Sequence, residues 1–309
     1  MRIAILGATS QIARDLIISF STSEDKSLHL FARRPDEVAK WLVLAGLSGR
    51  YPVDDFSEFT KGEFDAIINF VGVGNPAQAV AMGDSIFEIT LKYDILALDY
   101  LHQHPDCRYL FLSSGAVYGP NFDEPVDENS KATIAINHLQ PQDWYAVAKL
   151  YAECHHRALS HLPIVDIRVF NYFSHTHDVS ARFLITDILR AIQHGDTLIT
   201  SSDNIVRDYI GPDDFYQMVA LILAAPVTND VVDCYTKAPV DKVTLLSSMS
   251  HNFGLMYEIR QTPVGVNATG VKTNYFSRNH RAQTFKYDPE KSSLESVLSE
   301  AHLMVRGWK

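Results

Sequence analysis

The sequence predicts an α/β protein built on a doubly wound parallel sheet. Short apolar runs of strand length alternate with amphipathic stretches of helix length. The chain opens with an apolar strand, Arg2 to Leu6, followed at once by small residues and a helix through about Phe20. A later apolar strand, Arg108 to Leu112, runs directly into two serines and a glycine. Both junctions place small polar residues at the carboxyl ends of strands, where open parallel sheets bind ligands.

Composition excludes several classes of protein. With 309 residues, 46% of them hydrophobic, the chain can form one large domain or two smaller ones. A net charge of −10 argues against nucleic-acid binding, which requires a basic surface. The three cysteines are odd in number and widely separated, so we expect neither a disulfide framework nor a metal site. The chain has no long apolar run and no basic leader, which predicts a cytoplasmic protein that does not bind membranes.

The turn after the first strand has the position and residue order of a dinucleotide-binding turn. Its small residues would let the backbone approach a pyrophosphate at the helix N-terminus. The usual pattern has three glycines, and here Ser10 and Ala13 replace the second and third. Ala13 needs only close helix packing, whereas Ser10 either crowds the pyrophosphate or uses its hydroxyl to cap the helix or bond a phosphate. A strand-turn-helix without a ligand is the alternative. The predicted cofactor contacts in this turn are Gly7, Thr9, Ser10, Gln11 and Ile12.

The ends of the next strands extend this prediction. The second strand, Leu28 to Phe31, is followed by Arg33 and Arg34 and by no acid. Arginines at this position accommodate a 2′-phosphate, so we expect NADP(H) to be preferred, with NAD possible. The alternative is that both arginines solvate a loop. The fourth strand, Ala66 to Val71, runs into Gly72, and we expect Val71 and Gly72 to border the cofactor.

Tyr145 and Lys149 carry the sharpest chemical signal. Residues four apart share one face of a helix, so the two side chains would project together. An ammonium beside a phenol favours the phenolate and would bring its pKa from about 10 toward neutrality. A general acid/base for a hydroxyl or carbonyl needs such a group. Alone, the pair is equally compatible with a helix surface.

Taken together, these motifs resemble the extended short-chain dehydrogenase/reductase family of nucleotide-sugar epimerases, dehydratases and reductases. The resemblance covers nearly the whole chain and implies a Rossmann-type cofactor domain. It implies that Ser114, three residues before a Val-Tyr-Gly element, acts with Tyr145 and Lys149 in catalysis. It also implies that Asp54 occupies the position that contacts adenine.

The same resemblance implies substrate contacts. Asn171 ends an Arg-x-x-Asn element, and Arg207 begins an Arg-Asp-Tyr-Ile element whose arginine would bind a diphosphate. Arg278 and Arg281 lie where the family often has another phosphate-binding arginine, although either is equally a solvated charge. The predicted substrate-binding residues are Ser114, Tyr118, Asn171 and Arg207.

Domain division and assembly follow from the resemblance. We expect an NAD(P)-binding domain over 1–170 with a returning segment at about 205–236, and a substrate-binding lobe from 171–204 and 237–309. The stretch 84–104 is apolar around most of a helix and needs cover on more than one side. The resemblance implies a homodimer through helices 84–104 and 144–160, and burial within one chain is the alternative.

Two reactions fit these residues. The first is an NADPH-dependent reduction of a 4-keto-6-deoxy nucleotide sugar, with Tyr145 as general acid. The alternative is an NAD-dependent nucleotide-sugar epimerase using the same residues. A dehydratase is disfavoured because Gly115 and Ala116 stand where those relatives have an Asp-Glu pair. A non-catalytic dinucleotide sensor is a further alternative, but such relatives typically lack catalytic residues that are present here.

Overall fold

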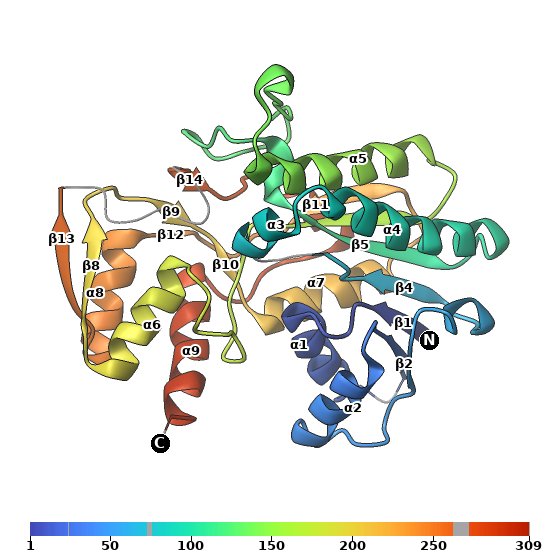
Figure 1. Ribbon diagram of the computed structural model, residues 1–309, viewed down its shortest axis with the longest axis horizontal. Coiled ribbons are helices and arrows are strands. Elements are labelled where there is room, and N and C mark those ends of the chain that lie inside the picture. The colour runs from blue at the N-terminus through green and yellow to red at the C-terminus, as the bar shows by residue number, and fades with distance from the viewer. Residues whose placement is uncertain (24, 73–75, 262–271, 309) are drawn as a thin grey trace.

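The structure is a computed structural model that describes residues 1–23, 25–72, 76–261 and 272–308. A larger lobe surrounds the main sheet, and a smaller lobe contains the C-terminal helix (Figure 1). No helix in the described part of the chain is long and apolar enough to cross a membrane.

The main sheet has seven strands in the order β11-β6-β5-β4-β1-β2-β3, and every pairing is parallel. This arrangement confirms the predicted doubly wound α/β fold. The strands are β1 (Arg2–Leu6), β2 (Ser27–Phe31), β3 (Val53–Asp54), β4 (Ala66–Asn69), β5 (Arg108–Ser114), β6 (Ile164–Val169) and β11 (Asp230–Asp233).

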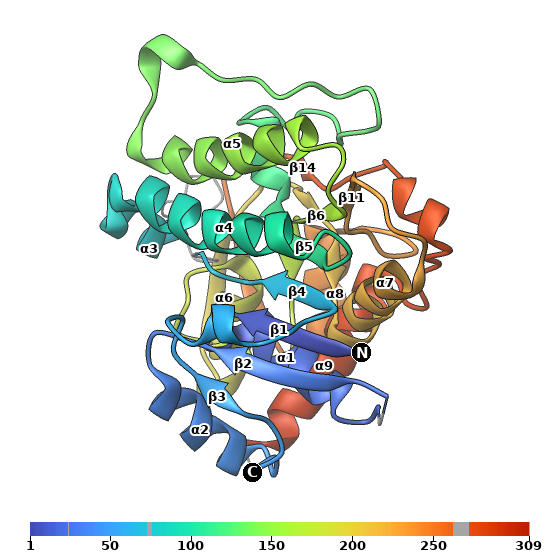
Figure 2. The same cartoon turned by 90° about the vertical axis from the view of Figure 1, so that its right-hand side faces the viewer.

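Helices cover both faces of this sheet. α4 and α5 lie side by side on one face, and α1, α2 and α7 lie on the other (Figures 1 and 2). The alternation along β1 explains the two layers, because Ile3 and Ile5 pack toward α1 and α7 while Ala4 and Leu6 pack toward α4 and α5. The helices are α1 (Gln11–Phe20), α2 (Pro35–Leu44), α3 (Pro76–Met82), α4 (Ser85–Gln103), α5 (Trp144–Ala158) and α7 (Pro212–Ala224).

Two strand ends differ from the sequence prediction. β5 continues through Ser114, two residues beyond the apolar run, because parallel pairing with β6 extends to that residue. β4 ends at Asn69 and not at Val71, because the Asn69 side chain accepts the Val71 N–H in place of a strand partner (2.9 Å). Both differences lie at the carboxyl edge of the sheet, where backbone and side chains compete for the same bonds.

The smaller lobe packs its helices around a separate core that includes Phe173 and Leu246. Its elements are α6 (Leu184–His194), α8 (Lys242–Phe253), α9 (Ser293–Arg306) and three small sheets: β7 (Asn171–Tyr172) with β10 (Tyr209–Ile210), β8 (Thr197–Ser201) with β13 (Met256–Arg260), and β9 (Val206–Arg207) with β12 (Val240–Asp241) and β14 (Asn274–Tyr275). α9 begins with a capping box formed by Ser292 and Glu295.

A buried carboxylate connects α1 to the segment that follows β7. Asp15 accepts hydrogen bonds from the hydroxyls of Tyr172 (2.9 Å), Ser174 (2.7 Å) and Thr176 (2.7 Å). Burial raises the pKa of Asp15, and these hydroxyls partly oppose the rise. The helix of the dinucleotide turn is therefore held directly against the chain entering the smaller lobe.

A second buried network lies under α5. Arg168 on β6 donates from Nε to both carboxylate oxygens of Glu153 (3.1 and 3.0 Å) and from Nη1 to the Tyr118 hydroxyl (2.7 Å). Its Nη1 also lies 3.4 Å from a carboxylate oxygen of the fully buried Asp233. The arginine thus compensates two carboxylates that solvent does not reach.

Replacing that arginine should cost much of the stability of the larger lobe. We expect Arg168→Met to lower the free energy of unfolding by about 3–5 kcal/mol, because Glu153 and Asp233 would stay buried without a cation. The measurement is urea-induced unfolding followed by circular dichroism. Arg260→Met is the matched control, since it breaks an exposed pair with Glu258 and should leave the midpoint unchanged. Equal midpoints for the two variants would contradict the role given to Arg168.

Candidate active site

β5 and α5 position the three predicted catalytic residues. Ser114 is the last residue of β5, Tyr145 lies in the first turn of α5, and Lys149 follows one turn later on the same face. The start of α5 is preceded by a short 3-10 helix, Pro141–Asp143, in which the Asp143 carboxylate accepts the Gln140 N–H (2.9 Å). The Ser114 hydroxyl oxygen accepts the Ala116 N–H (3.2 Å), which orients it at the sheet edge.

The pKa of Tyr145 shifts in the opposite direction to the one that the sequence predicted. Burial raises the pKa of its phenol, and a hydrogen bond with Ser114 opposes the rise. A pKa lowered toward neutrality by Lys149 was expected, and that expectation is wrong for this structure. The physical reason is that the Lys149 ammonium donates to the Leu112 carbonyl (2.7 Å) and lies 4.1 Å from the centroid of the Phe111 ring.

Lys149 is buried, with 3% of its surface exposed. Burial lowers the pKa of its ammonium to about 8, against the opposing attraction of Asp94, Asp166 and Glu153. At pH 7 the lysine therefore retains its charge, but it holds the proton less tightly than an exposed lysine. A cation at this position can stabilise negative charge on a neighbouring oxygen.

The dinucleotide turn has the backbone form that a pyrophosphate site requires. Gly7 has φ +82°, and a Cβ there would lie 2.9 Å from the Val71 backbone nitrogen. Ser10 has φ −63°, which any residue can adopt, so the missing second glycine causes no backbone strain. Its hydroxyl makes no capping bond to α1, so the first-turn N–H groups stay available to an anion. Ala13 is fully buried against the sheet, as the sequence predicted.

The other predicted contacts in the turn have different surroundings. Thr9 and Ile12 are partly buried, and Ile12 packs on the main core. The Gln11 side chain donates to the Ser174 hydroxyl (2.9 Å), so it connects α1 to the segment after β7. Val71 and Gly72 follow β4, and a Cβ at Gly72 would lie 3.4 Å from the Lys149 ammonium nitrogen. The residues after β4 and the catalytic lysine are thus in immediate contact, and the described residues fit a bound dinucleotide.

The arginines predicted to select NADP(H) over NAD(H) follow β2, and Asp54, which was predicted to contact adenine, ends β3. Arg33 and Arg34 are exposed, and Arg34 forms a pair with Glu37 (2.8 Å). Asp54 is bonded to the His29 ring (2.7 Å) across the β2–β3 pairing. The Asp54 carboxylate is therefore held in place by a neighbouring strand.

Of three predicted substrate contacts, Asn171 and Arg207 belong to small sheets of the smaller lobe, and Tyr118 follows β5 of the main sheet. The Asn171 amide donates to the carbonyls of Tyr275 (3.2 Å) and Asp208 (3.4 Å). The Tyr118 hydroxyl donates to Asp233 (2.9 Å) and accepts from Arg168, so its polar atom is already bonded. Arg207 is 4% exposed, and its Nη1 donates to the Val206 carbonyl (2.8 Å).

Arg207 also carries a buried nitrogen, Nη2, with no hydrogen-bond partner among the residues that the structure describes. Burial lowers the pKa of its guanidinium. A buried donor of this kind favours an anionic ligand, because the charge is otherwise incompletely compensated.

The sequence prediction missed Tyr275 and Lys272. Tyr275 pairs in register with Arg207 across the β9–β14 pairing, and its phenol lies close enough to the Ser114 hydroxyl for that hydroxyl to oppose the rise in the pKa of Tyr275. Lys272 lies 4.4 Å from the centroid of the Tyr275 ring. Nothing in the local sequence indicates this, because Tyr275 follows Ser114 by more than half the chain length and reaches it only through the pairing of β14 with β9.

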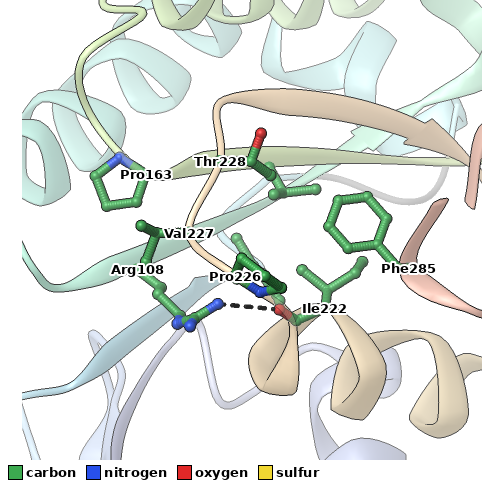
Figure 3. A pocket seen from close by; sticks show the side chains of 9 residues that line it. Arg108, Pro163, Ile222, Pro226, Val227, Thr228 and Phe285 are labelled. Atoms are coloured by element: carbon green, nitrogen blue, oxygen red, sulfur yellow. Dashed lines mark hydrogen bonds between the residues drawn. The ribbon is translucent and has the colours of Figure 1, made fainter.

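A small pocket at the opposite end of the strands is unrelated to these residues. It is lined by Arg108, the first residue of β5, together with Pro163, Ile222 and Phe285 (Figure 3). Arg108 donates to the Ile222 carbonyl there (3.2 Å). Ser114 stands at the other end of the same strand, so the catalytic candidates and this pocket are separated by the length of β5.

Solved structures share this architecture over the full chain. UDP-glucuronic acid 4-epimerase from Bacillus cereus, in complex with UDP-glucuronic acid and NAD, aligns with a TM-score of 0.77 and 16% identity over 99% of each chain. UDP-glucose 4-epimerase from Bifidobacterium longum, in complex with NAD+ and UDP, aligns with a TM-score of 0.77 and 17% identity, covering 99% of this chain and 98% of that one. dTDP-glucose 4,6-dehydratase from Bacillus anthracis, in complex with NAD, aligns with a TM-score of 0.78 and 13% identity, covering 99% and 97%.

These similarities establish the fold. The chain matched none of the curated proteins with which its sequence was compared. A family model, by contrast, matches residues 3–236, which include the dinucleotide turn and all three catalytic candidates. The chain therefore belongs to the NAD dependent epimerase/dehydratase family.

Proposed function

We propose that this protein is a nucleotide-sugar epimerase that uses a bound nicotinamide dinucleotide. The observation that carries the proposal is the meeting of Ser114, Tyr145 and Lys149 at the sheet edge beside the dinucleotide turn, in a chain of this family. The sequence alone favoured a reduction, with epimerisation as the alternative, and the epimerases that align over the full chain now favour epimerisation.

Each residue has a distinct part in the proposed reaction. Tyr145 takes the proton of a sugar hydroxyl as that carbon is oxidised and returns it when the carbonyl is reduced. Ser114, whose hydroxyl lies close to the Tyr145 phenol, would hold the same oxygen. The Lys149 ammonium would stabilise the Tyr145 phenolate, which must be present before the proton is taken and forms again when the proton is returned. The nicotinamide supplies a hydride acceptor that later returns the hydride, so the cycle consumes no cofactor.

Arg207 is the proposed anchor for the substrate diphosphate. Its guanidinium is buried, and Nη2 has no partner among the described residues, so a phosphate oxygen would complete its bonding. Planar guanidinium groups bind phosphate through two parallel bonds. Asn171 lies beside it through its bond to the Tyr275 carbonyl and completes the proposed substrate contacts.

A reductase remains the second candidate, for a specific reason. Arg33 is exposed at the end of β2, where an arginine accommodates the 2′-phosphate of NADP. A reductase consumes one NADPH in each turnover, whereas an epimerase causes no net oxidation. The two reactions therefore differ in cofactor stoichiometry and not in catalytic residues.

We also propose a homodimer through α4 and α5. Leu91 and Ile95 on α4 are 36% and 39% exposed, and Tyr151 on α5 is 56% exposed, although these helices already cover one face of the sheet. Burying this face against its copy in a second subunit would remove the apolar side chains from water.

The first prediction concerns the reaction. Incubated with NAD and a panel of UDP-, dTDP-, CDP- and GDP-linked hexoses, the protein should convert at least one sugar into its epimer with no net change in NADH absorbance. Tyr145→Phe should slow this conversion by about 10²- to 10⁴-fold, because the proton carrier is lost. Chromatography of the nucleotide sugars measures both rates.

Two controls make this result interpretable. The Tyr145→Phe variant should bind NAD as the wild type does, since it loses a hydroxyl and little packing. If no hexose changes configuration while 4-keto-6-deoxy nucleotide sugars oxidise added NADPH, the epimerase proposal is wrong and the reductase replaces it. Retained activity in Tyr145→Phe would refute the assigned mechanism for either reaction.

The second prediction concerns the dinucleotide. If Arg33 and Arg34 select a 2′-phosphate, as the reductase candidate requires, the wild type should bind NADPH more tightly than NADH, and Arg33→Ala with Arg34→Ala should weaken NADPH binding about tenfold while leaving NADH binding unchanged. Fluorescence titration with each nucleotide measures the four affinities. Lys40→Ala, an exposed cation on α2, is the control for general loss of charge. Equal affinities throughout would show that the arginines do not select a phosphate.

The third prediction concerns assembly. The wild type should be a dimer in solution, and Ile95→Glu should give a monomer because it places a charge in the proposed apolar interface. Light scattering after size exclusion measures both masses. Val43→Glu adds the same charge at an exposed apolar position on α2, and it should leave the dimer intact. A monomeric wild type would refute the proposed interface.

A further inference from the structure

Tyr275 brings a second phenol to the reaction centre. The Ser114 hydroxyl is close enough to this phenol and to that of Tyr145 to oppose the rise in the pKa of both. The Tyr275 ring packs against Phe122 (4.7 Å between centroids) and Phe170 (5.3 Å). The wall beside the catalytic serine is therefore aromatic, and β14 of the smaller lobe supplies part of it.

Two cations lie against this wall. The Lys272 ammonium is 4.4 Å from the centroid of the Tyr275 ring and 4.8 Å from that of Phe122, and the Arg207 guanidinium carbon is 5.9 Å from the Tyr275 ring. No salt bridge to either cation occurs among the described residues. Two like charges at one ring repel each other, so an anion between them would stabilise both.

The arginines suggested by the sequence do not supply this second charge. Arg281 forms a two-bond pair with Asp230 (Nε to Oδ1 2.5 Å, Nη2 to Oδ2 3.1 Å). Arg278 is exposed. Lys272 is thus the cation that the structure places beside Arg207.

We propose that Lys272 and Arg207 form a two-cation subsite for a negatively charged oxygen group of the substrate, with Tyr275 and Phe122 as its wall. The group is either the diphosphate of the nucleotide sugar or a carboxylate on the sugar ring. Both present the same chemistry to an ammonium and a guanidinium. The inference rests on the proposed nucleotide-sugar function and adds to it the residues Lys272, Tyr275 and Phe122.

Titration of Lys272 provides an independent readout. Burial, and then repulsion by Arg207, lower the pKa of Lys272 to about 8, while Asp143 at the start of α5 opposes the shift. The pKa values of the facing phenols, Tyr145 and Tyr275, are raised, so they stay neutral while the lysine titrates. The unliganded protein therefore loses this positive charge as the pH rises through about 8, and affinity for an anion should fall in the same range.

The experiment is calorimetric titration of the NAD-loaded protein with UDP, UDP-glucose and UDP-glucuronic acid at pH 7 and pH 9. Lys272→Met should weaken binding about 10- to 100-fold at pH 7, as expected for loss of a charged hydrogen bond. Lys272→Arg should retain most of the affinity. The affinity of the wild type for the two UDP-sugars should fall between pH 7 and pH 9, and that of Lys272→Arg should fall less, because a guanidinium keeps its charge while Lys149, whose pKa is also about 8, still titrates. Lys237→Met, at an exposed lysine of the smaller lobe, is the matched control.

The three ligands distinguish the source of the charge. If Lys272→Met weakens the binding of all three ligands equally, the lysine contacts the diphosphate. If it weakens only the binding of UDP-glucuronic acid, the lysine contacts a sugar carboxylate. Wild-type affinity in a folded Lys272→Met overturns the subsite, as does the same pH dependence in wild type and Lys272→Met. A protein that binds UDP-sugars through Lys272 but epimerises none contradicts only the proposed reaction. A wild type that binds none of these three ligands and none of the dTDP-, CDP- and GDP-linked hexoses overturns both.

Discussion

The burial of the Lys149 ammonium is the constraint around which the larger lobe is built. An isolated charge cannot be removed from water without compensation. In this protein the Lys149 charge is compensated by the Leu112 carbonyl, the face of the Phe111 ring and the negative charges of Asp94, Asp166 and Glu153. Because β5 and β6 and the helices α4 and α5 all contribute to this environment, the position of the lysine depends on how these elements pack together.

The carboxylates that stabilise the Lys149 ammonium are themselves buried, so they also need neighbouring cations. His156 lies between Asp94 (2.8 Å) and Asp166 (2.6 Å), and all three side chains are fully buried. Burial opposes a charge on this histidine, but Asp166 and Asp94 outweigh it and raise its pKa to about 9. Glu153 is matched in the same way by Arg168. The interior beneath α5 thus holds an alternating set of charges, in which each residue is stable only because its neighbours are ionised.

The two halves of the candidate site are built differently. On the cofactor side, the site is formed by the backbone. Gly7 adopts a left-handed turn that passes close to the backbone after β4, and the N–H groups at the start of α1 have no side-chain cap. On the substrate side, side chains prepare it, with Arg207 and Lys272 held against one aromatic ring. The first arrangement depends mainly on backbone form, whereas the second depends on the identity of individual side chains.

The sequence by itself determined the fold class, and it pointed to Ser114, Tyr145 and Lys149 as a candidate triad. Those features follow from local patterns: strand and helix periodicity, small residues at strand ends and the four-residue spacing on α5. Only the tertiary structure decided that burial dominates the pKa of Tyr145, that the Tyr118 hydroxyl is occupied by Asp233 and Arg168, and that Tyr275 reaches Ser114. Desolvation depends on everything packed around a group, and a contact between distant segments depends on strand pairing. Neither the desolvation of a group nor a contact between distant segments can be predicted from the spacing of neighbouring residues.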